Sequence, residues 1–209
     1  MNAAGASPSV ELRQEFNRLR AELPARYLAV TSARGGEGVT TVALGIAHAL
    51  AARGPTLLAE GHLRQPVLAQ RLGLRGSGLA GWGGSGPLPV QALPGAADVS
   101  VLCGGEAPGS AGPDAAAVLA EAAEQARSQF AQVVWDTPPL TACPDLLRLA
   151  PHIDGVIVVV EMDRTHVDEL QFLRDVLARA QIPILGSLLN RCSRYWPRPG
   201  RRRAVAGRS

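Results

Sequence analysis

A glycine-rich stretch at residues 32–41 has the residue types and spacing most typical of chemistry in this chain, and it reads Ser-Ala-Arg-Gly-Gly-Glu-Gly-Val-Thr-Thr. It follows the apolar run 27–30 and precedes an alanine-rich segment, 39–53, with helical periodicity. A strand, a glycine-rich turn and a helix in this order predict a phosphate-binding loop, because backbone N–H groups and the helix N-terminus face an anion there. The residues that we expect to bind the phosphate are Arg34, Gly35, Gly36, Glu37, Gly38, Val39, Thr40 and Thr41.

Val39 stands where such a loop carries a lysine, whose ammonium group neutralises the β- and γ-phosphates of a nucleotide. All 21 basic residues of the 209-residue chain are arginines, so no other lysine can take this place. Arg34 is the cation within the loop, and two roles stay open for it. It can hold a phosphate through two parallel hydrogen bonds, or it can be a solvated loop residue. The sequence therefore predicts the shape of a nucleotide site without its usual charge.

Four polar residues that end or follow predicted strands are candidates for metal binding or catalysis. Thr40 has the position from which a loop hydroxyl reaches Mg²⁺, and Asp136 ends an apolar strand, where a metal-facing carboxylate is expected. Both have structural alternatives, since a threonine at a helix start and an aspartate before a turn are also good caps. Glu60 and His62 lie where a second acidic pair would hold the metal and activate a nucleophile. His62 can act as a base, although a lone loop histidine is commonly polar surface.

Apolar strand patterns alternate with helical patterns, which indicates an α/β fold: a doubly wound, mostly parallel sheet with helices on both faces. Ligands bind such sheets at the carboxyl ends of the strands, where the loop and the candidate residues fall. Residues 76–98 are rich in glycine, proline and serine and predict a long surface loop. The predicted strands are 27–32, 56–60, 99–102, 132–136, 155–161 and 184–189, and the predicted helices are 11–23, 39–53, 67–74, 113–130, 143–149 and 165–180.

Length and composition indicate one domain, because 209 residues with 46% hydrophobic residues can form a sizeable core. We expect disorder at 1–10, the domain at 11–190, and a flexible tail at 191–209 that holds seven arginines and no acid. The other 14 of the 21 arginines face 18 acidic residues, and this acidic body argues against nucleic acid as a ligand. Without an apolar run of about 18 residues, the chain is predicted to be cytoplasmic. Its basic tail can contact an acidic membrane surface or an acidic face of a partner, or it can be a solvated extension.

Three motifs point to a known family. The first is the loop at 32–41, and the second is Leu-Leu-Ala-Glu-Gly-His-Leu-Arg-Gln-Pro at 57–66. The third, an apolar strand followed by Asp-Thr-Pro-Pro, is intact at 133–139, and Gly-Ser-Leu-Leu-Asn ends at Asn190. Together they resemble the bacterial tyrosine kinase (BY-kinase) family of the CpsD/CapB type, which acts in capsule and exopolysaccharide synthesis. The resemblance spans 11–190 and implies a P-loop NTPase-like fold, ATP and Mg²⁺ as cofactors, and contact between Asn190 and adenine.

The match to this family is incomplete at the residues that perform its chemistry. Val39 replaces the lysine of the first motif, and Glu60 and His62 replace two aspartates of the second. In the helix ahead of the first strand, Arg20 is the one residue kept of a three-residue pattern for ring-like self-assembly. The family's C-terminal tyrosine cluster, its autophosphorylation target, is reduced to Tyr195. These losses argue against strong binding of ATP and Mg²⁺ and against enzymatic activity.

The combined losses predict a catalytically degenerate BY-kinase-like protein, a pseudokinase, that is a cytoplasmic partner or regulator of exopolysaccharide or capsule polymerisation and export. Its expected partners are a Wzz-like membrane polysaccharide co-polymerase or a true BY-kinase, and self-association into an oligomer stays open. One alternative is an active, divergent ATP-dependent tyrosine autokinase or ATPase that uses Arg34, Glu60 and Asp136. The other is a positioning ATPase like ParA and MinD, whose loop the stretch 34–41 also resembles.

Overall fold

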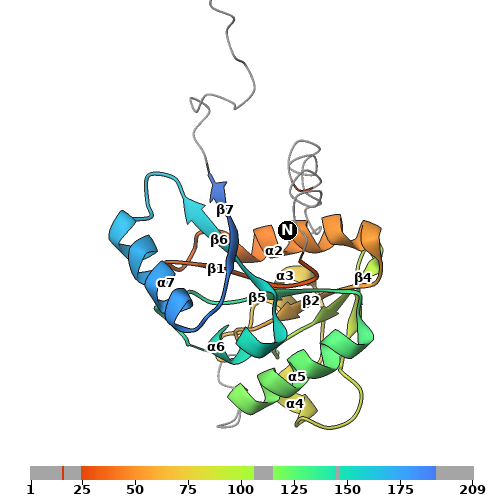
Figure 1. Cartoon of the computed structure of the whole chain (residues 1–209). Coiled ribbons are helices and arrows are strands. Elements are labelled where there is room, and N and C mark those ends of the chain that lie inside the picture. The colour runs from red at the N-terminus through yellow and green to blue at the C-terminus, as the bar shows by residue number, and fades with distance from the viewer. Residues whose placement is uncertain (1–15, 17–24, 106–114, 145, 192–209) are drawn as a thin grey trace, which may run out of the picture.

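The computed structural model describes residues 16, 25–105, 115–144 and 146–191, and its centre is a seven-stranded sheet with helices on both faces (Figure 1). The strand order is β3-β4-β2-β5-β1-β6-β7, and neighbouring strands are parallel except for β3 and β4. This order confirms the predicted doubly wound, mostly parallel sheet. The strands are β1 (Tyr27–Ser32), β2 (Thr56–Glu60), β3 (Gln91–Leu93), β4 (Ala96–Leu102), β5 (Gln132–Asp136), β6 (Gly155–Glu161) and β7 (Ile184–Asn190).

The helices divide between the two faces of the sheet and bury two separate apolar clusters. Helices α2 (Val39–Leu50) and α3 (Leu68–Leu72) contribute to one cluster. The other cluster contains residues of α4 (Gly78–Trp82), α5 (Ala115–Gln129), α6 (Leu146–Leu149) and α7 (Val167–Arg179). Short 3₁₀ turns follow α2 and α6 at η1 (Ala51–Arg53) and η2 (Ala150–His152).

The sequence of β6, Gly-Val-Ile-Val-Val-Val-Glu, explains its interior position in the sheet, between β1 and the edge strand β7. β-branched residues favour an extended backbone, and both faces of this strand are covered. Val156 and Val158 join one apolar cluster, and Ile157 and Val159 join the other. Strand β1 lies between β5 and β6 and is almost completely buried. The carboxyl ends of these three strands therefore lie side by side at one edge of the sheet.

The prediction of a long surface loop at 76–98 is wrong, because this segment contains a helix and one strand of a hairpin. Leu79 of α4 is fully buried, and its N–H donates to the Cys103 carbonyl oxygen at 2.9 Å. Residues 91–93 pair antiparallel with β4, which begins at Ala96 and not at residue 99. Glycine and proline dominate the composition here, but the segment is held against the core by three buried leucines. They are Leu79, Leu88 and Leu93.

The other predicted elements in the described residues are confirmed: β1, β2, β5 and β6 have the predicted bounds, and the remaining elements have shifted ends. Helix α2 ends at Leu50, α7 spans 167–179, and β7 continues to Asn190. Of the predicted helix 11–23, the structure describes Phe16, which is helical; the disorder predicted at 1–10 and the tail beyond residue 191 lie outside the described residues. None of the helices in the described part of the chain has both the length and the hydrophobicity needed to span a bilayer.

Phe16 connects the segment before β1 to helix α2. Its side chain is 3% exposed and belongs to the apolar cluster on the α2 face. A Cβ atom on Gly45, in the middle of α2, would overlap the Phe16 ring. A glycine inside a helix costs about 1 kcal/mol relative to alanine, so its presence here is explained by the space that the ring requires.

We expect Gly45→Ala to destabilise the protein by about 1–3 kcal/mol, because the added methyl group displaces the Phe16 ring. In the Phe16→Ala background the same change should be neutral or should stabilise by up to about 1 kcal/mol, since alanine is the better helix former. Urea unfolding of the wild type, both single variants and the double variant measures this coupling. Strictly additive effects would contradict the packing of Phe16 on α2.

Candidate functional site

The candidate residues meet at the carboxyl edge of the sheet. Asp136, at the end of β5, pairs in register with Glu60 at the end of β2, so two carboxylates lie on neighbouring strands. On the other side of β1, Glu161 of β6 pairs with Asn190 of β7. The glycine-rich loop at 33–38 leaves β1 between these two pairs and leads directly into α2.

Two glycines give the loop its shape. Gly36 has a φ of 88° and Gly38 a φ of 92°, both in the left-handed region that favours glycine. Gly38 is also the residue that precedes the first turn of α2, and the N–H of Val42 donates to its carbonyl oxygen at 3.1 Å. Backbone N–H groups at the start of a helix of this length can face an anion. The predicted strand, loop and helix are therefore present in the expected order.

Glu37, between the two glycines, points into the protein and is completely buried. Its carboxylate accepts the backbone N–H of Arg34 at 3.2 Å and the hydroxyl group of Thr165. The Thr165 hydroxyl in turn accepts the N–H of Glu161 at 2.9 Å. The Glu37 side chain therefore connects the loop to the end of β6 and the start of α7. Sequence reasoning missed the role of Thr165, because this residue lies 128 positions from Glu37.

Asn190 holds the loop from the other side. Its side-chain Nδ2 donates to the carbonyl oxygen of Glu37 at 2.8 Å, and its Oδ1 accepts the N–H of Arg191 at 2.9 Å. A Cβ atom on Gly38 would overlap the Asn190 amide group. Each end of this amide thus has one protein partner, which fixes its orientation, and one further donor and acceptor position stay available for the predicted contact with adenine.

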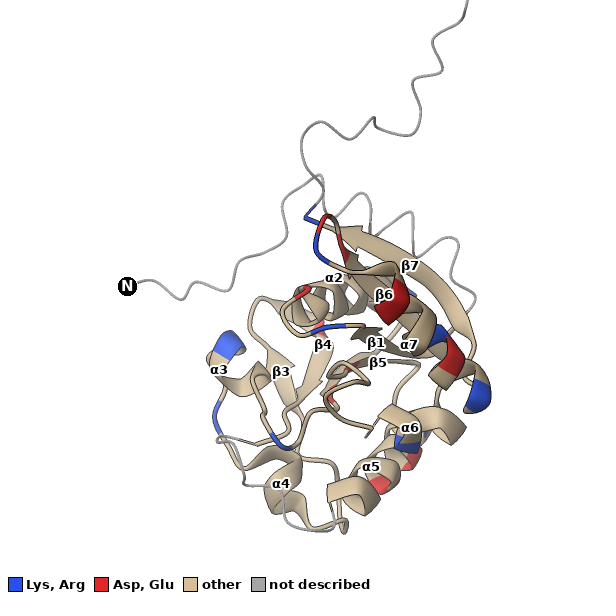
Figure 2. Cartoon of the chain, turned by 90° about the vertical axis from the view of Figure 1, so that its left-hand side faces the viewer, with Lys and Arg blue, Asp and Glu red and all other residues tan. Residues whose placement is uncertain are grey.

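Three arginines surround the loop, and each is paired with a carboxylate. The Nε atom of Arg34 lies 3.4 Å from Oε1 of Glu169 on α7. Arg164 and Arg191 place their Nη1 atoms 3.0 and 2.8 Å from the two oxygens of Glu161. The hydrogen bond from Arg191, together with that from Arg164, holds the pKa of Glu161 below its usual value. Figure 2 shows this charged turn between β6 and α7 beside the end of β7.

Arg164 lies over the glycine-rich loop. Its Nη1 atom would be 3.4 Å from a Cβ placed on Gly36, so the guanidinium group covers this glycine. Arg34, by contrast, is turned toward α7 by its pair with Glu169. The sequence indicated that 161–164 follows a strand near the site, but it did not indicate which arginine would lie against the loop.

Thr40 and Asp136 are brought together as their predicted metal-binding role requires. The Thr40 side chain forms a hydrogen bond with the Asp136 carboxylate, which lowers the pKa of Asp136. Burial has the larger and opposite effect, and the neighbouring charge of Glu60 adds to it, so the pKa of Asp136 is raised from its ordinary value of 3.8 to about 7. A buried carboxylate of this kind is typical of a functional site.

Glu60 has its two oxygens occupied by backbone donors. One oxygen accepts the N–H groups of Val67 and Leu68, the latter at 3.0 Å, and the other accepts the N–H of Gly104 at 2.8 Å. Desolvation nevertheless raises its pKa. Glu60 therefore joins β2, α3 and the end of β4. His62 is half-buried two residues later, and among the described residues no group of three His, Cys, Asp or Glu side chains could hold a metal ion.

Curated relatives align with most of this chain. Tyrosine-protein kinase YwqD of Bacillus subtilis (strain 168) is 29% identical over 174 residues, which are 77% of this chain and 70% of the relative. Tyrosine-protein kinase CpsD of Streptococcus agalactiae (serotype Ia) is 27% identical over 184 residues, which are 80% of this chain and 75% of the relative. The succinoglycan biosynthesis transport protein ExoP of Rhizobium meliloti (strain 1021) is 31% identical over 182 residues, which are 79% of this chain but 22% of ExoP. No family model matches the chain.

Solved structures agree with these relatives. The VpsO kinase domain has a TM-score of 0.74 at 26% identity and covers 88% of this chain and 94% of that domain. The chain is thus similar to the BY-kinase family over most of its length. The kinase domain of Escherichia coli ETK, at 20% identity, has a TM-score of 0.72 over 88% of this chain and 79% of that chain. MinD of Pyrococcus horikoshii, complexed with Mg-ADP, has a TM-score of 0.66 at 23% identity and covers 81% of this chain and 71% of that chain. These two show the fold, which is that of the ParA/MinD class of P-loop proteins.

The residues at this site fit ATP and Mg²⁺, the cofactors that the resemblance implies, only in part. Thr40 and Asp136 provide the hydroxyl and the carboxylate that would hold Mg²⁺, directly or through water. Gly36 and Gly38 keep the loop open to an anion. Val39, however, contributes no charge to the phosphates and packs against the apolar cluster on the α2 face. The site is therefore better suited to the metal than to the charge of a triphosphate.

Asp136→Asn is expected to stabilise the protein at pH 8. Because the pKa of Asp136 rises from 3.8 to about 7 on folding, its contribution to stability is greatest below pH 4 and is lost as the pH rises through 7. Three pKa units correspond to an upper limit of about 4 kcal/mol. Unfolding of both proteins in urea between pH 4 and 8 measures the effect. Asp98→Asn, at an exposed position of β4, is the matched control. If the stability of Asp136→Asn depended on pH as that of the wild type does, the raised pKa of Asp136 would be contradicted.

Proposed function

We propose that this chain is a member of the BY-kinase family and, within it, a pseudokinase, a cytoplasmic partner or regulator of exopolysaccharide or capsule polymerisation and export. The observation that carries the proposal is Val39, an apolar and partly buried side chain at the position of the phosphate-binding lysine. The chain retains the fold and the loop, and it lacks the charge on which phosphoryl transfer depends.

The surrounding residues do not restore that charge. Arg34 is paired with Glu169 and turned toward α7. Glu60, which replaces the first aspartate of the family's second motif, is bound by three backbone N–H groups and is thereby a structural residue. His62 replaces the second aspartate, and an imidazole does not provide the negative charge that holds a divalent metal. Each change removes one part of the usual catalytic arrangement.

Phosphoryl transfer is sensitive to losses of this kind. Its transition state spreads negative charge over the transferred group, and the protein contributes mainly positioning and positive charge. Removal of one stabilising donor or cation typically costs a factor of about 10² to 10⁵ in rate. Loss of the lysine together with two metal-binding carboxylates thus supports a role other than catalysis.

The relatives support a role in polysaccharide export. ExoP is a succinoglycan biosynthesis transport protein, and a region like this chain makes up 22% of it. In ExoP such a domain is therefore part of the same polypeptide as the rest of a transport protein. By analogy, we propose that the present chain binds a separate membrane protein of this class, a Wzz-like co-polymerase, or an active BY-kinase, at the inner face of the membrane. The basic residues after Arg191 would add contact with acidic lipid.

Helix α7 and the edge strand β7 are the proposed docking surface for this partner. Four of the five exposed large hydrophobic residues in the described part of the chain lie on these two elements, and the fifth is Val90. An exposed group of apolar side chains on neighbouring elements is typical of a protein interaction site. The four are Val167, Phe172, Ile184 and Leu189, with exposed fractions of 66%, 55%, 43% and 50%.

A second function, that of a divergent ATPase or autokinase, is supported by one arrangement. Arg164 covers Gly36 of the loop, and Thr40 bonds to Asp136 where Mg²⁺ would be held. An arginine beside the phosphates can replace part of the missing charge. The positioning ATPase of the ParA/MinD type also needs nucleotide turnover, so one measurement separates both alternatives from the pseudokinase.

We expect the wild type to bind ATP–Mg²⁺ more weakly than about 10⁻⁴ M in calorimetry and to show no ATP hydrolysis or tyrosine phosphorylation above background. Val39→Lys should tighten binding at least tenfold, because it returns the ammonium group to the loop. Val39→Met is the matched control, since it adds length without charge. Micromolar binding with turnover by the wild type, abolished by Asp136→Asn, would overturn the proposal and establish the alternative. Strong turnover by Val39→Lys would show that the changes at 60 and 62 matter little.

The partner is tested by affinity purification from cells that express the membrane polysaccharide proteins. We expect Phe172→Ser to reduce their recovery at least fivefold, because it removes an apolar contact from α7. Val90→Ser, at the other exposed hydrophobic position, should leave recovery unchanged, and both variants should keep the wild-type melting temperature. Deletion of 192–209 measures the part played by the basic residues. Equal recovery with Phe172→Ser and Val90→Ser would exclude the α7 surface.

A further inference from the structure

One carboxylate beside the glycine-rich loop holds two arginines from different segments of the chain. Glu161 ends β6, and its side chain is 11% exposed. Its Oε2 atom lies 3.0 Å from Nη1 of Arg164, in the turn between β6 and α7, and its Oε1 atom lies 2.8 Å from Nη1 of Arg191, directly after β7. Two guanidinium groups thus share a single negative charge, which leaves one positive charge in excess within these three residues.

The position of Glu161 is fixed by hydrogen bonds to the residues around it. Its N–H donates to the hydroxyl group of Thr165 at 2.9 Å, and this hydroxyl group donates to the buried carboxylate of Glu37 in the loop. Asn190, which pairs in register with Glu161, donates to the carbonyl oxygen of Glu37 at 2.8 Å. The end of β6 is therefore held beside the loop even if one arginine leaves the Glu161 carboxylate.

Of the two arginines, Arg164 is the one that reaches the loop. Its Nη1 and Nη2 atoms would lie 3.4 and 3.7 Å from a Cβ atom placed on Gly36. The Arg164 side chain is 47% exposed, and its Nη1 donates one hydrogen bond to Glu161. Because a guanidinium group has five N–H donors, Arg164 keeps donors for an anion above the loop while Glu161 binds it through a single oxygen.

We propose that Glu161 and Arg191 are positioning residues for the loop, because together they control whether Arg164 is available to a phosphate-bearing anion there. Arg191 occupies one oxygen of the Glu161 carboxylate. Without it, both oxygens can bind Arg164 as a bidentate pair, which is the stronger arrangement and draws the guanidinium group away from Gly36. Loss of the Glu161 charge has the opposite effect, since it releases Arg164 to the anion. The inference rests on the proposed function only for the weak binding of an anion at the loop.

Inorganic pyrophosphate is the probe for this proposal, because its binding can be measured without nucleotide turnover. It is titrated into the isotope-labelled full chain, and the amide signals of Gly36 and Gly38 are followed by NMR. We expect Glu161→Gln to tighten binding about threefold to fivefold and Arg191→Gln to weaken it by a similar factor, which is the size that a partly exposed ion pair allows. Arg164→Gln should weaken binding at least as much as Arg191→Gln, because it removes the group that meets the anion.

Three further variants separate positioning from a general effect of charge. In the Glu161→Gln background, Arg191→Gln should change the affinity less than about twofold at physiological salt, because distant charges are screened there and Arg191 acts through this carboxylate. Arg191→Lys should bind like the wild type, since an ammonium group can occupy the same oxygen. Asp163→Asn is the matched control: it removes a negative charge from the same turn without altering either pair, and asparagine suits its φ of 62°.

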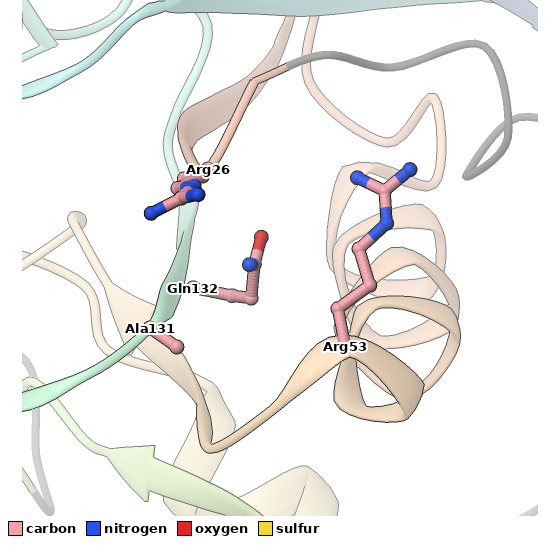
Figure 3. Close-up of a pocket in the computed structure, with 4 residues that line it drawn as sticks. All are labelled: Arg26, Arg53, Ala131 and Gln132. Carbon is pink, nitrogen blue, oxygen red and sulfur yellow. The ribbon is translucent and has the colours of Figure 1, made fainter.

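A cavity at the opposite edge of the sheet controls for binding elsewhere in the molecule. It has a volume of about 370 Å³ and lies where the parallel strands begin. Its lining residues are Arg26, Arg53, Ala131 and Gln132 (Figure 3). The amide signals of Ala131 and Gln132 report on pyrophosphate at this cavity, and substitutions at 161, 164 and 191 should leave their response unchanged.

The order of affinities decides the outcome. Equal affinities of the wild type, Glu161→Gln and Arg191→Gln at the loop glycines would overturn the inference. So would an effect of Arg191→Gln that persists in the Glu161→Gln background, or the absence of shifts at the loop with about 20 mM pyrophosphate in all of these proteins. Melting temperatures show whether each variant folds. ATP turnover by the wild type would overturn the proposed function and leave this order intact, so the two failures are distinguishable.

Discussion

The buried carboxylate of Glu37 is the interaction on which the loop and its surroundings depend. It receives the N–H of Arg34 from the loop and the hydroxyl of Thr165 from the start of α7, while Asn190 binds the carbonyl oxygen of the same residue. The loop is therefore held by contacts with β6, β7 and α7 within the protein. None of these contacts uses the side chain at position 39, so they can maintain the strand-to-helix turn with Val39 in place of a lysine.

Two neighbouring carboxylates at the same edge of the sheet differ in their hydrogen-bond partners, although burial raises the pKa of both. Glu60 is buried but receives three backbone hydrogen bonds, so its charge is compensated by donors that belong to the fold. Asp136 is buried beside it, with Thr40 as a side-chain partner, and its pKa rises to about 7. A bound cation would stabilise the ionised form of this buried carboxylate. Asp136 is therefore the carboxylate of this pair that we propose as a metal ligand.

Most of the fold could be predicted from the sequence because its signals are local. The continuous β-branched run of β6 and the strand-loop-helix order around Gly36 each lie within a few residues, and the parallel topology then brings Asp136 and Thr40 to one edge. The side-chain directions could not be predicted in this way. Arg34 turns toward Glu169 and Thr165 binds Glu37 across more than 120 positions, and Gln132 borders a cavity with residues of two other segments. Such contacts depend on tertiary packing. The same is true of α4 and β3, because the glycine and proline content of 76–98 predicted a loop there.

The arginines around the loop separate anion binding from phosphoryl transfer. Arg34 and Glu169 have side chains that are 41% and 32% exposed, and an exposed ion pair contributes only about 0–1 kcal/mol, so an anion can take over such an arginine at little cost. Phosphoryl transfer requires more than anion binding, because the cation must be fixed where negative charge develops and must remain there through the reaction. The Arg164 guanidinium group lies over Gly36 from outside the loop and is paired with Glu161, so it does not meet this condition as an ammonium group inside the loop does. The geometry therefore supports weak binding of an anion without phosphoryl transfer, as the proposed pseudokinase role requires.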